Sequence, residues 1–176
     1  TRTLTAHTDA VLSVSWSRVT GLLASGSRDG AVHVWEASGE TRRLAGHRGG
    51  TASVEWSPID GRLATAGVDG VVRVWHGVSG ALVQELHGHV GRVYSVSWAH
   101  NGRALVSKSE DGSLRVWDAI TWGGVAVVRE DGVALPDPWL RFPTDTRAFH
   151  PSRPQLATNG TGPSERIRVL EFDFDA

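Results

Sequence analysis

The sequence contains no cysteine and no methionine in its 176 residues. The absence of cysteine excludes disulfides, thiolate nucleophiles and Cys-ligated metal sites. An excess of charge of one sign is also lacking, since 18 basic and 19 acidic residues leave a net charge of −1. This balance produces no overall field that would attract nucleic acid or an anionic membrane, so neither is expected as a partner.

Long apolar runs are absent as well. No segment approaches the roughly 20 residues that span a bilayer, and the N-terminus lacks the charged and apolar regions of a secretory signal. We therefore expect a cytoplasmic protein. The chain begins at Thr1 and has no methionine, and we expect it to be part of a longer protein.

What the sequence has in excess is tryptophan and glycine, with 8 Trp against a single Tyr, and 21 Gly. Most of the tryptophans belong to a pattern in which the same residue type recurs after 40 and then 42 residues. Two Trp series, a His series and an Asp series follow this spacing: Trp16, Trp56, Trp98; Trp35, Trp75, Trp117; His7, His47, His89; Asp29, Asp69, Asp111. The chain therefore contains an internal repeat of about 40 residues.

Each repeat is predicted to form three or four short strands. In the first, residues 11–16 and 31–35 alternate with a period of two, and residues 22–27 run into the turn signal Asp29-Gly30. No stretch of ten residues has helical periodicity, so the fold is predicted to be all-β. Because the strands carry apolar residues on both faces, each sheet must lie between two others, which predicts a β-propeller.

The repeats, which end in Trp35, Trp75 and the pair Trp117-Asp118, resemble WD40 (WD-repeat) propellers. We predict one domain over residues 1–176, with four-stranded blades from repeats at about 1–37, 38–78 and 79–119 and a degenerate fourth at 120–176. In that fourth repeat Phe149 takes the place of the first Trp and Leu170 the place of the second, and about ten extra residues fall within 119–147.

Ser, His and Asp recurring together are also the composition of a hydrolase triad. The resemblance implies instead a buried hydrogen-bond chain in each repeat, from Trp to a Ser or Thr hydroxyl, to His and to Asp. Three copies of a catalytic site in so short a chain also argue for the structural interpretation. The expected sets are His7, Ser25, Asp29, Trp35; His47, Thr65, Asp69, Trp75; and His89, Ser107, Asp111, Trp117.

No catalytic, cofactor or metal site is expected. His87 and His89 lie close together with His100 nearby, but His89 belongs to the repeat pattern and no third ligand has suitable spacing. Motifs for a phosphate-binding loop or a nucleophile elbow are missing. The sequence is thus predicted not to be an enzyme.

The resemblance implies a protein or peptide partner on the face of the entry loops and Asp-Gly turns. By position, its contacts would fall at the start of the first strand and just before the turn Asp. Blade three is the best candidate, since Tyr and Arg are favoured at interfaces. The candidate residues are Leu12, Arg28, Arg92, Tyr94 and Glu110, with the smaller Ala10, Gly50, Ala52 and Val68 at the remaining positions.

Three functions remain open from the sequence. The first is a protein-interaction scaffold or sensor module at the C-terminal part of a larger bacterial signalling or effector protein. Seventeen of the 18 basic residues are Arg, which is typical of a high-GC bacterial source. The alternatives are an architectural oligomerisation module and a propeller enzyme with a site in its central channel.

Ring closure also has three solutions. Residues 1–5 take the place of a fourth strand and would complete the last blade, which otherwise lacks its outer strand. One chain would then form a four-bladed ring. Two chains would form an eight-bladed homodimer of half-rings, and a fragment would lack blades that precede Thr1.

Overall fold

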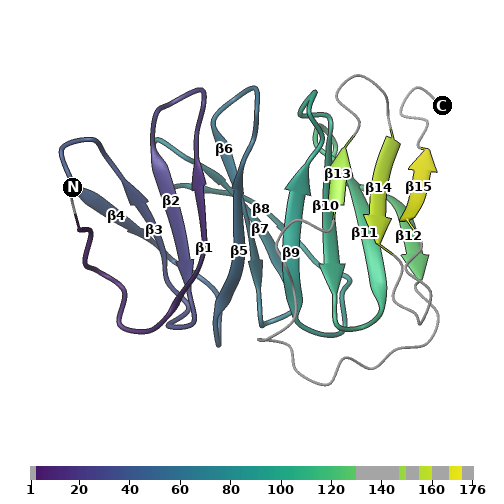
Figure 1. Ribbon diagram of the computed structural model, residues 1–176, viewed down its shortest axis with the longest axis horizontal. Coiled ribbons are helices and arrows are strands. Elements are labelled where there is room, and N and C mark those ends of the chain that lie inside the picture. The colour runs from purple at the N-terminus through teal and green to yellow at the C-terminus, as the bar shows by residue number, and fades with distance from the viewer. Residues whose placement is uncertain (1–2, 130–146, 150–154, 160–166, 172–176) are drawn as a thin grey trace.

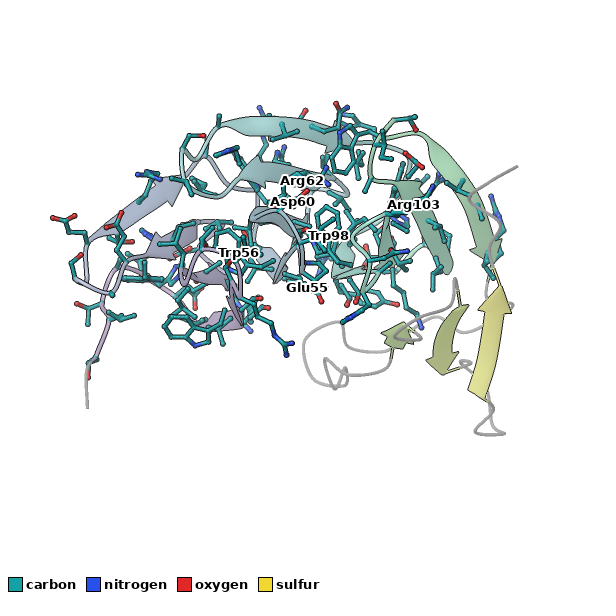
Figure 2. All side chains as sticks on the ribbon, turned by 90° about the horizontal axis from the view of Figure 1, so that it is seen from above. Glu55, Trp56, Asp60, Arg62, Trp98 and Arg103 are labelled. Carbon is teal, nitrogen blue, oxygen red and sulfur yellow. The ribbon has the colours of Figure 1, made fainter. Side chains whose placement is uncertain are left out.

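Every regular element that the structure describes is a β-strand. The computed structural model describes residues 3–129, 147–149, 155–159 and 167–171, and within these ranges 15 strands form four antiparallel sheets. Figure 1 shows the first three sheets side by side from the purple N-terminal end, with the last sheet, in yellow, at the C-terminal end. Figure 2, seen from above, shows that the sheets follow an arc. The prediction of an all-β fold built of propeller blades is confirmed.

Neighbouring strands in each sheet are consecutive in the chain. The first sheet contains β1 (Val11–Trp16), β2 (Leu23–Ser27), β3 (Val32–Trp35) and β4 (Thr41–Leu44). The second contains β5 (Thr51–Trp56), β6 (Arg62–Gly67), β7 (Val72–His76) and β8 (Leu82–Leu86). The third contains β9 (Val93–Trp98), β10 (Ala104–Ser109), β11 (Ser113–Asp118) and β12 (Gly124–Arg129), and the last β13 (Arg147–Phe149), β14 (Gln155–Asn159) and β15 (Ile167–Glu171).

The pairing of residues between the first and second strands is the same in every repeat. The Trp at the end of the first strand pairs with a Leu in the second strand of every complete sheet, as in Trp16 with Leu23 and Trp56 with Leu63. Phe149 pairs with Leu156 in the same way. The degenerate fourth repeat therefore keeps the register of the others, although its Trp is replaced.

The last sheet has three strands among the described residues, where four were expected. Residues 130–146, which include most of the predicted insertion, lie outside the described ranges. Residues 1–5 were expected to form a strand, yet residues 3–6 are in no strand, and residues 1–2 are not described. The structure thus gives the last sheet no strand from the N-terminus of its own chain.

Sheets pack face to face because their strands are apolar on both sides. Val32 and Val34 of the first sheet contact a cluster that includes Trp56 and Trp75 of the second. A Cβ at Gly26 would lie 2.7 Å from the Thr51 side chain, so glycine here allows β5 to approach β2 closely. Each such buried aliphatic side chain contributes about 1.5–3 kcal/mol to stability. Packing of the second sheet against the first and the third therefore holds these three blades together and fixes the loops at their rim.

Candidate partner-binding face

A hydrogen-bond chain runs from the core of each complete blade to the Asp-Gly turn at its rim. In the second blade, the Trp75 indole donates to Thr65 Oγ1 at 3.0 Å. Thr65 Oγ1 lies 2.8 Å from His47 Nε2, and His47 Nδ1 lies 2.9 Å from Asp69 Oδ1. Because a charged carboxylate can only accept, His47 donates from Nδ1 to Asp69, and the neutral ring then accepts at Nε2 from the Thr65 hydroxyl.

The first and third blades repeat this chain. Their Trp-to-Ser distances are both 2.9 Å, their Ser-to-His distances 2.7 and 2.8 Å, and their His-to-Asp distances both 3.1 Å. The structure thus places the twelve side chains in three contacting sets: His7, Ser25, Asp29, Trp35; His47, Thr65, Asp69, Trp75; and His89, Ser107, Asp111, Trp117.

The Asp at the end of each chain ties two loops together. Asp29 accepts from the backbone N–H of Ala31 in its own turn and of Thr8 in the entry loop, both at 2.8 Å. Asp111 accepts in the same way from Ser113 at 2.8 Å and Val90 at 2.9 Å. The entry loop and the Asp-Gly turn are therefore held as one unit at the rim of each blade.

The electrostatics favour a charged Asp in each set and a neutral His in the second and third blades. Burial raises the pKa of Asp29, but hydrogen bonds from Thr8, Ala31 and His7 outweigh this and lower its pKa to about 2. Burial lowers the pKa of His47 and of His89, so both imidazoles are neutral at pH 7. Each set is thus a fully hydrogen-bonded structural network.

A basic residue joins the network in the second blade, and the sequence analysis missed it. Arg73 Nη1 donates to Asp69 Oδ2 and Arg73 Nε donates to Glu85 Oε1, both at 2.8 Å. His33 and Arg115 occupy the same position of the repeat. The signal that could have revealed them is this second series of basic residues, two positions before the last Trp of each repeat.

The predicted partner contacts lie where the entry loop meets the Asp-Gly turn. One backbone bond recurs there in every complete blade, from Arg28 to Ala10 and from Val68 to Gly50 at 3.0 Å, and from Glu110 to Arg92 at 2.9 Å. Arg28 and Glu110 are exposed, whereas Leu12, Ala52, Arg92 and Tyr94 are half-buried. The structure therefore brings these residues to one rim in three equivalent positions.

Blade three carries the most varied chemistry at this rim. The Arg92 guanidinium lies 3.7 Å from the Glu110 carboxylate, which also accepts from the Arg92 backbone N–H at 3.1 Å. Beside them Val90 is 93% exposed. Sequence reasoning missed Val90; the signal was an apolar residue directly after the entry His, where the other repeats have Thr8 and Arg48.

The first strands of the three complete blades, β1, β5 and β9, line a polar groove of about 460 Å³, with Ser13, Ser53 and Ser95 among its residues. Two of these hydroxyls join neighbouring blades: Ser13 accepts from Val54 N at 3.1 Å and Ser53 from Val96 N at 3.4 Å. The part of the chain that the structure describes contains no group of three His, Cys, Asp or Glu that could hold a metal ion. Nor does it contain a helix of the length and apolarity needed to cross a membrane.

Comparison with known proteins identifies a family and solved structures of similar fold. The sequence model described as "WD domain, G-beta repeat", WD40, matches residues 1–36, 39–76 and 80–118, which is more than half of the chain. No curated protein matches the sequence. A solved structure titled "Crystal Structure of Mitotic Checkpoint Complex" contains a chain similar to this one with a TM-score of 0.80 and 23% identity. The likeness covers 98% of this chain and 52% of that chain, so this chain spans about half its length.

Proposed function

Because the chain belongs to the WD40 repeat family, we propose that it is a protein-interaction module that binds a protein or peptide on the face of its entry loops. The observation that supports this most directly is the tie between each entry loop and its Asp-Gly turn. A surface held in one conformation loses little entropy when a partner binds. The module would act through this surface and not through chemistry of its own.

Blade three is the proposed centre of contact. It combines an exposed apolar side chain at Val90, the only tyrosine at Tyr94, and the Arg92–Glu110 pair. Tyr and Arg are enriched among the residues that dominate binding energy, and an apolar neighbour helps to exclude water. A partner segment with an apolar side chain flanked by charge of either sign would fit this chemistry.

A hydrolase is the alternative that the repeated Ser, His and Asp raise, and burial argues against it. Ser25 is 4% exposed, and Thr65 and Ser107 are 0% exposed. Each hydroxyl already accepts from a Trp indole and contacts a His, so none is in reach of a substrate. We therefore propose that the chain is not an enzyme and takes no cofactor.

The wider context is also a proposal. The predominance of Arg over the single Lys108 supports a bacterial source, and we place the module in the cytoplasm within a larger signalling or effector protein. Any catalytic activity of that protein would belong to other domains.

The binding site is tested with a double variant, Arg92→Ala with Tyr94→Ala, in affinity capture from an extract of the source cells. Proteins retained by the parent chain should be lost by the variant, while the melting temperature stays within a few degrees because these residues lie at the rim. The matched control is Val19→Ala, which truncates an exposed side chain in the β1–β2 turn at the other end of the strands. Equal capture by all three proteins would refute a site on blade three.

A further inference from the structure

The third blade contains a guanidinium group with a buried donor that lacks an acceptor. Arg115 Nε is buried and has no hydrogen-bond partner, and Arg115 forms no ion pair within the part of the chain that the structure describes. Its guanidinium lies 6.0 Å from the centre of the Trp117 ring and against Gly88, where an added Cβ would lie 2.7 Å from Arg115 Nη1. Proteins retain few buried donors without an acceptor, because each is costly. This one therefore indicates a place for an acceptor.

The equivalent residue of the second blade shows which acceptors this position takes. Arg73 Nη1 donates to Asp69 and Arg73 Nε donates to Glu85, both at 2.8 Å. Glu85 lies directly across from Arg73 on the neighbouring strand. At the same place in the third blade, Val127 lies across from Arg115. An apolar side chain therefore stands where the acceptor of the Nε–H group would be expected.

The turn carboxylate of the third blade is engaged by other donors. Asp111 Oδ1 accepts from the Ser113 hydroxyl at 2.6 Å and from the Ser113 backbone N–H at 2.8 Å. Asp111 Oδ2 lies 3.1 Å from His89 Nδ1 and accepts from the Val90 backbone N–H at 2.9 Å. The Ser113 hydroxyl thus provides a donor to the turn carboxylate, as Arg73 does in the second blade, and Arg115 does not pair with it.

We propose that Arg115 binds a carboxylate of the protein partner, from a Glu or Asp side chain that takes the place of Glu85 in the second blade. The planar guanidinium matches the geometry of a carboxylate. Val125 and Val127 of β12 are 42% and 49% exposed, so a partner reaches this strand from solvent and finds apolar contacts beside the charge. A singly charged carboxylate fits better than a phosphate, because one guanidinium balances one negative charge.

This site adjoins the proposed centre of contact on the entry-loop face. Gly88, which lies against the guanidinium, belongs to the same loop between β8 and β9 as Val90 and Arg92. That the carboxylate comes from a protein rests on the proposed function. The affinity of Arg115 for a carboxylate does not, since it follows from the buried Nε–H group and the comparison with Arg73.

A peptide titration of the full chain, followed by nitrogen–proton correlation NMR, tests the proposal. The probe is the blocked peptide acetyl-Val-Glu-Val-amide, and its match without charge is acetyl-Val-Gln-Val-amide. The Glu peptide should shift the signals of the Arg115 Nε–H group and of the Gly88 amide until they saturate, and the Gln peptide should not. Inorganic phosphate is a further probe, and it should bind more weakly than the Glu peptide.

Two substitutions place the binding at Arg115. Arg115→Gln should weaken binding of the Glu peptide, read at the Gly88 amide, by about tenfold or more, because a charge-assisted hydrogen bond is lost. Val127→Glu should weaken it as much with Arg115 in place, since its own carboxylate would take the guanidinium, and should by itself move the Nε–H signal as the peptide does. Val125→Glu is the matched control, because it adds the same charge to the same strand away from Arg115, and it should retain most of the binding.

The proposal is overturned if the Glu peptide leaves the Arg115 signal unmoved. Equal shifts with both peptides would show an apolar contact without recognition of charge, and tighter binding of phosphate would show a phosphate site; each would refute the carboxylate. Unchanged affinity in Arg115→Gln would place the peptide elsewhere. A shift at Arg115 together with unaltered capture by the Arg92→Ala, Tyr94→Ala variant would support this site and refute the proposed centre of contact.

Discussion

Removal of the Asp69 carboxylate is the sharpest test of the hydrogen-bond chains. Asp69 accepts from His47 Nδ1 at 2.9 Å and from Arg73 Nη1 at 2.8 Å. It also accepts from the backbone N–H groups of Val71 and Arg48, at 3.3 and 3.2 Å. Asp69→Ala would leave four donors without this acceptor, and one of them belongs to the buried His47.

The expected cost follows from which donors water can reach. A buried donor left without an acceptor costs about 1–3 kcal/mol, while each exposed backbone bond contributes about 0.5–1.5 kcal/mol. Arg48 is exposed and His47 is only 6% exposed, so the buried imidazole carries most of the loss. We expect Asp69→Ala to lower the free energy of unfolding by about 3 kcal/mol, which corresponds to a decrease in Tm of roughly 6–12 °C in a chain of this size.

Thermal unfolding followed by circular dichroism measures this decrease. The control is Asp60→Ala, which removes another Asp-Gly carboxylate of the same blade. Asp60 forms a surface ion pair with Arg62 at 2.6 Å, and an exposed pair of this kind is worth about 0–1 kcal/mol. If Asp69→Ala lowers Tm no more than Asp60→Ala does, the buried network does not stabilise the second blade.

Two further predictions concern the same networks. Burial lowers the pKa of His47 and His89 in the folded state, so stability should be full above about pH 6.5 and should fall as pH drops through the lowered values. A second loss of stability should follow below about pH 4, because the pKa of Asp29 is about 2 in the folded state against an ordinary 3.8. The measurement is Tm from neutral pH down to about pH 3, and a Tm that did not change over this range would contradict both expected losses. Gly67→Ala should destabilise the chain by about 1–3 kcal/mol, because the added Cβ would overlap the His47 ring and the neighbouring carboxylate. Gly124→Ala is its control, because the added Cβ would meet nothing within 4 Å. This variant should change the free energy of unfolding by no more than about 0.5 kcal/mol.

The local features of the fold were predictable because they repeat. A period of 40 and 42 residues identified the blades, and alternation of apolar residues identified strands such as β1 and β3. The register of the degenerate repeat also followed, since Phe149 and Leu156 pair as Trp56 and Leu63 do. The network partner Arg73 did not follow, because a basic residue in a strand is ordinarily a solvated side chain.

The positions of the candidate residues along the repeat were predictable, but their contacts and exposure were not. Resemblance by position pointed to Arg92, Tyr94 and Glu110, yet only the structure shows that Arg92 and Glu110 pair with each other and that Val90 is almost fully exposed. Such relations depend on how the entry loop folds against the turn. Sequence spacing places residues at the same rim and leaves their mutual contacts undecided.

The sequence by itself determined the unit of this protein: a repeat of three or four short strands with a Trp at fixed places and apolar residues on both faces. The polar chain behind each turn came from the family resemblance. Such a unit must pack on both sides, and this much is local pattern together with the hydrophobic effect. Only the tertiary structure decided which of these faces are buried against a neighbouring sheet. Trp16 and Trp56 occupy the same position of the repeat, but one is 67% exposed and the other 5%. Burial depends on what lies across the interface, and a residue's neighbours across a blade junction come from another repeat about 40 residues away.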